Sequence, residues 1–238
     1  MVGNTARAAK SCNVDLAWSG VNDATILDRF LRSDLQWAEC DVRSNHEHQQ
    51  LLVREVSFVD LPVHDDEFML KLADVIEEVR EAGRSIKLDF KDDLAVDKTL
   101  AILKESGLED SRIWFCGRVG DLKESFFRQL RQAHPHAVIQ CPVCSLGPVL
   151  LEDDSHKAYR ILSTLEPWGV DRFSVRWNTP NLSGVIEAIE DLGFPANLYN
   201  VPNARVFDEA ISLSPKSVTA VFHDFAMDGS SPRAGAGV

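Results

Sequence analysis

Short apolar runs alternate along the chain with longer segments of helical periodicity. The runs are rich in β-branched and aromatic residues, as in strands buried within a sheet. In the stretch 68–79 the apolar residues lie three and four positions apart, which predicts a helix that ends on Gly83. Strand candidates occupy 14–18, 35–42, 51–56, 86–90, 113–116, 138–143, 173–177, 196–201 and 218–222. This alternation predicts a parallel sheet built from repeated βα units.

The βα rhythm returns about every 25 to 40 residues, and a chain of 238 residues has the usual length of one α/β barrel. We therefore predict a single (β/α)8 TIM-type barrel over 1–228, followed by a disordered tail of small and polar residues at 229–238. Nine strand candidates exceed eight barrel positions, so one is either an extension or not a strand; 138–143 and 173–177 fit the pattern least well. An open doubly wound sheet would alternate similarly, but no glycine-rich nucleotide motif follows the first strand. Further helix candidates occupy 25–32, 96–106, 121–133, 156–165, 182–192 and 204–212.

Charged residues occupy alternate positions on two of the predicted strands. Because alternate side chains of a strand share a face, Glu39 and Asp41 project together, as do Lys87, Asp89 and Lys91. The residues between them are mainly apolar and suit the outer, helix-covered face of a barrel. The charged sets should therefore point inward, and the later members of each set should lie nearest the mouth, where the carboxyl ends of the strands form the functional rim.

Buried charges must pair, bind an ion or lie at a hydrated mouth. One interpretation is a lysine–carboxylate network that only stabilises the core. Another is a site in which Glu39, Asp41 and Asp89 supply hard oxygen ligands for Mg²⁺ or Ca²⁺, while Lys87 and Lys91 bind phosphate. This arrangement predicts metal-assisted cleavage of a phosphodiester. A third interpretation is an aldolase-type enzyme that forms a Schiff base on one of the lysines, with Asp89 as proton shuttle.

The net charge of −12 and the absence of a basic cluster disfavour nucleic acid and anionic membranes as partners. No apolar stretch reaches the roughly 20 residues that span a bilayer, and the first residues lack the apolar segment of a secretory signal, so we expect a cytoplasmic protein. Five cysteines are too few and too odd in number for a disulfide framework. Cys141 and Cys144 form a C-P-V-C pair that suits zinc or redox chemistry, but no second ligand pair accompanies it, and two small apolar residues at a strand end are the preferred interpretation.

The order of several motifs resembles a known group of barrels. An E-x-D pair in WAECDV, an acid-x-lysine pair in IKLDFK and a late acid in VFHDF together resemble the phospholipase C-like phosphodiesterase superfamily, which includes glycerophosphodiester phosphodiesterases. With AWSGVND and IWFCGRV added, the pattern more closely resembles the menorin family, whose members share that barrel. The resemblance extends from about residue 15 to residue 224.

The resemblance implies roles for particular residues. Glu39, Asp41 and Asp89 match the metal-binding carboxylates, Lys91 matches the lysine that follows them, and Asp224 matches the acid at the end of the last strand. The two histidines that act as general acid and base in the superfamily do not match histidines here. The first falls on Ser19 and the second on Arg54 or Glu55, while an asparagine of the menorin pattern falls on Cys116. If active, the chain would be a metal-dependent phosphoric diester hydrolase; the missing histidines favour a pseudoenzyme that binds a partner or serves as a scaffold.

Other histidines lie where they could replace the missing pair. His64 in PVHDDEF follows the third strand candidate, and His223 adjoins the late acid, but a solvated loop histidine and a structural histidine are the preferred interpretations. His46 and His48 lie in a polar loop after the second strand candidate, within reach of Asp41. Arg176 and Trp177 end another strand and could line the mouth for an anion or a ring, or simply pack. The sequence does not indicate an oligomeric state.

Overall fold

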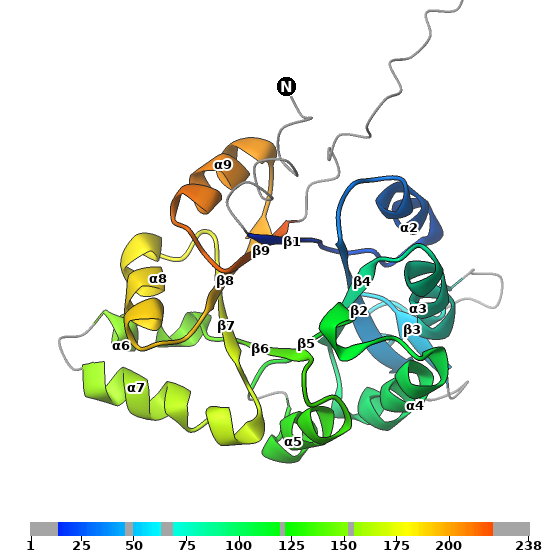
Figure 1. Cartoon of the computed structure of the whole chain (residues 1–238), viewed down its shortest axis with the longest axis horizontal. Coiled ribbons are helices and arrows are strands. Elements are labelled where there is room, and N and C mark those ends of the chain that lie inside the picture. The colour runs from blue at the N-terminus through cyan, green and yellow to red at the C-terminus, as the bar shows by residue number, and fades with distance from the viewer. Residues whose placement is uncertain (1–13, 46–49, 63–68, 120–121, 152–154, 221–238) are drawn as a thin grey trace, which may run out of the picture.

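The computed structural model describes residues 14–45, 50–62, 69–119, 122–151 and 155–220. Eight parallel strands form a closed barrel in which β1 pairs with both β9 and β2, as Figure 1 shows in a view that looks into the ring. This confirms the predicted (β/α)8 fold. The strands of the ring are β1 (Asp15–Trp18), β2 (Trp37–Asn45), β4 (Ser85–Phe90), β5 (Ile113–Cys116), β6 (Val138–Pro142), β7 (Arg172–Arg176), β8 (Ala196–Val201) and β9 (Ser217–Ala220).

Helices surround the barrel because each carries one apolar stripe that packs on the strands (Figure 1). Two of them begin at side-chain caps: Asp23 accepts a hydrogen bond from the amide of Ile26, and Asn203 accepts one from the amide of Val206. No helix among the described residues is long and apolar enough to cross a bilayer. The helices are α2 (Ala24–Leu31), α3 (Leu72–Glu81), α4 (Val96–Ser106), α5 (Glu124–Ala133), α6 (Gly147–Leu150), α7 (Ser155–Ser163), α8 (Leu182–Asp191) and α9 (Ala204–Ser212).

The surplus strand is β3 (Gln50–Val53), which corresponds to the candidate at 51–56. It pairs antiparallel with the last four residues of β2 and forms a hairpin rather than a barrel position. The expectation that 138–143 or 173–177 was the surplus strand was therefore wrong, since β6 and β7 are both barrel strands. The reason is that periodicity within one strand does not show its partner. Pairing is decided by hydrogen bonds between distant segments.

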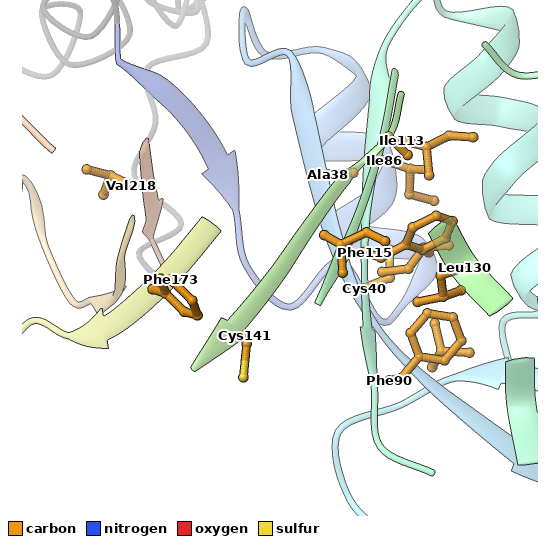
Figure 2. Close-up of a cluster of buried hydrophobic side chains, with 14 of the residues drawn as sticks. Ala38, Cys40, Ile86, Phe90, Ile113, Phe115, Leu130, Cys141, Phe173 and Val218 are labelled. Atoms are coloured by element: carbon orange, nitrogen blue, oxygen red, sulfur yellow. The ribbon is translucent and has the colours of Figure 1, made fainter. Parts of the chain in front are cut away.

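The main hydrophobic core lies between the outer faces of the strands and the helices. Ala38 and Cys40 of β2, Ile86 of β4 and Phe115 of β5 are fully buried, and Figure 2 shows them with Leu130 of α5. These are the residues that alternate with the charged positions of β2 and β4. Burial of this apolar face fixes which way each strand turns, and the charged residues consequently face the interior.

Two tryptophans, Trp37 and Trp114, fill the barrel interior on the side away from the mouth, and we call this layer the floor. Trp37, at the start of β2, contacts Trp114 of β5 edge to face, with 5.6 Å between the ring centroids. Lys87 Nζ lies 4.3 Å from the centroid of Trp114, and the Arg172 guanidinium lies 4.6 Å from it. Arg172 also donates to Ser217. The polar site described next therefore rests on a packed layer rather than on an open pore.

Candidate metal and phosphate site at the barrel mouth

Strand register brings the two charged sets together. Glu39 lies opposite Lys87, and Asp41 lies opposite Asp89, on the adjacent strands β2 and β4. Exposure increases toward the carboxyl ends of the strands: Lys87 is 2% exposed, whereas the side chains of Asp89 and Lys91 are 24% and 25% exposed. The predicted inward orientation is confirmed. On β4 the later members are the more exposed, as predicted, whereas Asp41 is as buried as Glu39, at 6% and 5% exposed.

Glu39, Asp41 and Asp89 form one compact group, which we call the acid trio. One carboxylate oxygen from each lies within 4.8 Å of the others. The pKa of Glu39 is raised to about 7, mainly by burial and then by the nearby charges of Asp41 and Asp89, while Lys87 and the hydrogen bond from Ser19 act in the opposite direction. Three neighbouring carboxylates, two of them buried and one partly exposed, fit a hard divalent cation such as Mg²⁺ or Ca²⁺. The acid trio can therefore hold a metal ion.

The loop after β1 holds two members of the acid trio in place. Ser19 Oγ and the amide of Gly20 donate to the same oxygen of Glu39, at 2.7 and 2.8 Å. Gly20 has a φ of +78°, a conformation that favours glycine and that aims its amide at the carboxylate. Asn22 donates to Asp41 Oδ2 at 2.5 Å and accepts from the Asp41 amide at 2.9 Å. Ser19 is thus committed to orienting a carboxylate, at the position where the resemblance expects a histidine.

Lys91 lies between two members of the acid trio. Its Nζ is 2.6 Å from both Asp41 Oδ1 and Asp89 Oδ2. Burial by itself lowers the pKa of Lys91, but the two carboxylates outweigh it and raise the pKa well above its usual value. A Schiff base requires a neutral amine. The geometry therefore argues against Lys91 as the nucleophile of an aldolase-type reaction.

Lys87 lies deeper than Lys91 and has different partners. Its Nζ donates to Thr219 Oγ1 of β9 at 2.7 Å and lies over the ring of Trp114. Contact with an aromatic face is a favourable interaction for a cation. Lys87 nevertheless borders the same cavity as the acid trio, so its charge lies below any anion bound there.

A cavity of about 840 Å³ opens above the acid trio at the mouth. Arg54 borders it from the segment after β3, and the Arg54 amide donates to the Asp41 carbonyl at 2.7 Å. The guanidinium of Arg54 donates to the Leu61 carbonyl through Nη2 and lies over Phe58, but its buried Nη1 has no hydrogen-bond partner among the described residues. A buried cationic donor without an acceptor costs free energy. Arg54 thus adds a basic side chain to the lining of the cavity.

The opposite wall of the cavity comes from β6, β7 and β8. Gln140 and Ser174 are almost completely buried, and Gln140 Oε1 and Ser174 Oγ have no partner within the described part of the chain. Arg176 stacks over Tyr199, with 5.8 Å from the guanidinium carbon to the ring centroid. Tyr199 also makes a 3.0 Å hydrogen bond with Cys144. This wall offers polar groups that lack partners, together with one exposed arginine.

The structure brings together most, but not all, of the residues that the sequence singled out. Arg176 and Cys116 border the cavity with the acid trio and both lysines. Burial raises the pKa of Cys116 well above its ordinary value, which keeps it a neutral thiol. Cys141 and Cys144 are free and do not join a metal-ligating group among the described residues. Five further candidates lie outside the described residues: His46, His48, His64, His223 and Asp224.

Several site residues were missed from the sequence. Gly20 and Asn22 lie in the AWSGVND motif, whose loop position beside a strand end was the signal for their role. Arg54 was noted only as a replaced histidine, and nothing in the sequence marks Gln140 or Ser174 as cavity residues. Of the described residues, no histidine borders the cavity.

Solved structures with the same fold include several phosphodiesterases. A phosphodiesterase from Oleispira antarctica, in complex with the product sn-glycerol-3-phosphate, matches with a TM-score of 0.66 and 11% identity over 92% of this chain and 96% of that chain. A glycerophosphodiester phosphodiesterase from Parabacteroides distasonis matches with a TM-score of 0.60 and 13% identity over 87% and 92%. An HpcH/HpaI aldolase from Desulfitobacterium hafniense also matches, with a TM-score of 0.51 and 11% identity over 90% and 89%.

At 11% and 13% identity these likenesses show the fold alone, and they give no support to the narrower menorin resemblance. The aldolase match shows that the barrel also carries other chemistry, so function has to be argued from the site. No family model matches the chain, and no curated protein matches it by sequence.

Proposed function

We infer that this barrel binds a divalent cation on the acid trio and a phosphodiester in the cavity above it. The single observation that carries this proposal is the grouping of Glu39, Asp41 and Asp89 within 4.8 Å, beneath a cavity that basic side chains also border. A cation on these residues would polarise a phosphoryl oxygen and neutralise its charge. The protein's own contribution is to orient the carboxylates and to supply cationic donors to the anion.

Basic residues surround the place where a phosphate would lie. Arg54, Lys87 and Arg176 all border the cavity, and Lys87 lies deepest in the barrel. Lys91 bridges Asp41 and Asp89 and is close enough to donate to a phosphoryl oxygen if one of these ion pairs loosens. In a chain with a net charge of −12, such a concentration of basic groups in one cavity favours a specific anion over general surface attraction.

Binding is better supported than turnover. General acid–base catalysis requires a group that exchanges protons near neutral pH, and histidine is the usual choice. Among the residues that the structure describes around the cavity there is no histidine, and Ser19 bonds to Glu39 instead. Cation-dependent binding of a phosphodiester is therefore the proposed function. Two candidates share it: a metal-dependent phosphoric diester hydrolase, which needs another group to supply the proton, and a binding protein without hydrolysis.

Thermal unfolding tests the cation site directly. We expect Mg²⁺ or Ca²⁺ at about a hundred times its dissociation constant to stabilise the protein by about 2.7 kcal/mol, and excess EDTA to reverse this. Asp89→Asn should abolish this stabilisation. Asp171→Asn is the control: Asp171 pairs with Arg131 and is not part of the acid trio, so this variant should retain the stabilisation. Stabilisation that is absent from the wild type, or that survives in Asp89→Asn, would contradict the proposal.

Incubation with bis(p-nitrophenyl) phosphate separates the two candidates. Release of nitrophenol that depends on the cation and is lost in Asp89→Asn would identify a hydrolase. Intact diester together with cation-dependent binding of glycerol 3-phosphate would identify the binding protein.

A further inference from the structure

Lys91 is bonded to two of the three carboxylates that would hold a cation. Its Nζ lies 2.6 Å from Asp41 Oδ1 and 2.6 Å from Asp89 Oδ2, which are the distances of strong, charge-assisted hydrogen bonds. The side chain of Asp41 is 8% exposed and that of Lys91 is 25% exposed, so water screens this bridge less than it screens a surface ion pair. One ammonium group therefore neutralises part of the charge of the acid trio.

Both oxygens of Asp41 already have a donor. Asn22 Nδ2 donates to Oδ2 at 2.5 Å, and Lys91 Nζ contacts Oδ1. Divalent cations bind carboxylate oxygens at about 2.0 to 2.6 Å, a distance similar to that of the lysine nitrogen. A cation that binds Asp41 must therefore compete with one of these two donors.

Of the two donors, Lys91 is the one that a cation would displace. Asn22 is held at a second point, because its Oδ1 accepts a hydrogen bond from the Asp41 amide at 2.9 Å. A neutral amide repels a cation far less than an ammonium group at the same distance does. The Lys91 side chain has a flexible four-carbon stem and borders the mouth cavity, so it can turn away while its backbone amide stays bonded to the Val42 carbonyl.

Lys87 differs from Lys91 in the partners that hold its charge. Its side chain is buried, its Nζ donates to Thr219 at 2.7 Å, and it lies over the ring of Trp114. The floor therefore holds the charge of Lys87, whereas the acid trio holds the charge of Lys91. A cation that enters the acid trio breaks the contacts of Lys91 and leaves those of Lys87 intact.

We propose that Lys91 is a tethered cation that competes with the divalent ion for Asp41 and Asp89. Binding of Mg²⁺ at the acid trio breaks both ion pairs and turns the Lys91 ammonium into the cavity. The lysine thus weakens cation affinity and sets the concentration at which the site fills. This inference rests on the proposed function, because it concerns the regulation of the proposed cation site.

Calorimetric titration of the full chain with Mg²⁺ at fixed ionic strength tests the competition. Lys91→Met keeps much of the side-chain length and removes the charge. It should raise Mg²⁺ affinity about ten-fold, because an internal competitor that must first leave lowers the apparent affinity. Lys123→Met is the matched control: Lys123 lies 3.8 Å from Asp93 and its side chain is 80% exposed, so this variant should change Mg²⁺ affinity by less than about two-fold.

Two further substitutions separate charge from packing. Lys91→Gln also removes the charge and should raise Mg²⁺ affinity as Lys91→Met does, so it carries the test if the methionine variant fails to fold. Lys91→Arg keeps the charge and should not raise Mg²⁺ affinity. An equal increase in Lys91→Arg and Lys91→Met would attribute the increase to packing and overturn the proposal. Circular dichroism checks the fold of each variant.

Competitive acylation of the lysines, measured by peptide mass spectrometry, follows Lys91 itself. Lys91 should react several-fold faster in saturating Mg²⁺ than in EDTA, because an amine held between two carboxylates is a poor nucleophile. Lys123 is the internal reference and should react equally in both. In Asp89→Asn, which removes one partner of Lys91, the reaction should be fast and independent of Mg²⁺. A rate for Lys91 that Mg²⁺ leaves unchanged in the wild type would overturn the displacement.

The outcomes distinguish this inference from the proposed function. If the wild type binds Mg²⁺ as tightly as Lys91→Met or more tightly, the proposed cation site stands and the competition is overturned. If only Lys91→Met binds Mg²⁺, the competition holds and the wild type fails as a cation-binding protein. If neither binds Mg²⁺, both proposals fail.

Discussion

The barrel interior has two charged layers that differ in how their charges are satisfied. At the floor, Lys87 and Arg172 lie over Trp114 and donate to hydroxyl groups of β9. At the mouth, Asp41 and Asp89 share one lysine, and Glu39 lies beside them with a pKa raised to about 7. The floor satisfies its cations within the protein. The mouth concentrates acids and therefore favours an added cation.

This contrast separates stability from function on the same strands. Burial of a charge is costly unless partners compensate it, and the floor supplies those partners from several strands at once. The acid trio keeps part of its electrostatic repulsion, which only a ligand relieves. A functional site that is less stable than its surroundings is a common arrangement, because the ligand supplies the missing interaction.

The largest expected effect comes from the floor. Trp114→Ala should destabilise the protein by roughly 3–5 kcal/mol, because it opens a cavity and removes the ring beneath two cations. Trp114→Phe should cost much less, since it keeps a ring and since Trp114 Nε1 has no hydrogen-bond partner among the described residues. Urea unfolding measures both. Saturating Mg²⁺ should stabilise Trp114→Ala by no more than it stabilises the wild type. A larger stabilisation of the variant would show that the floor and the mouth are not independent.

A smaller effect is expected at the mouth from pH. In the folded protein the pKa of Glu39 is raised from 4.5, the ordinary value for a glutamate, to about 7. Burial is the main cause, followed by the charges of Asp41 and Asp89. The folded state therefore holds the proton more tightly, so this contribution to stability is complete below about pH 4.5 and is lost as pH rises through 7. Without a cation, Glu39→Gln should be more stable than the wild type by roughly 3 kcal/mol at pH 8 and similar to it near pH 4.5.

Urea unfolding in EDTA at several pH values measures this difference. The comparison of the variant with the wild type removes the titration of all other groups. A difference that is constant with pH, or that grows as pH falls, would contradict the assignment.

The smallest expected effect concerns Asn22, which positions Asp41 but is not itself a proposed ligand. Asn22→Ala should weaken cation affinity about ten-fold, as is usual when a group that orients a metal ligand is removed. Calorimetric titration of each variant with the cation measures the cation affinity. Asn203→Ala, which removes the cap of α9, is the control: it should lower stability and leave cation affinity unchanged. Equal affinity in Asn22→Ala and the wild type would show that Asp41 needs no support from this loop.

Local patterns in the sequence determined the fold class and the inward-facing charges. Strand periodicity fixed that Glu39 and Asp41 share a face, because side chains alternate and the opposite face had to bury apolar residues. The same argument correctly grouped Lys87, Asp89 and Lys91. It placed the later residues at the mouth because all barrel strands run in one direction.

Only the tertiary structure decided which strands are neighbours and what surrounds the acids. Periodicity within 51–56 could not distinguish the β3 hairpin from a barrel strand, since pairing depends on hydrogen bonds to β2. The support from Gly20 and Asn22 and the position of Arg54 beside the cavity arise where segments that are distant in the sequence meet. A strand's side-chain alternation is local and can be read from the sequence. Register and loop contacts are non-local, so the cavity that gives the charges their chemistry exists only in the closed barrel.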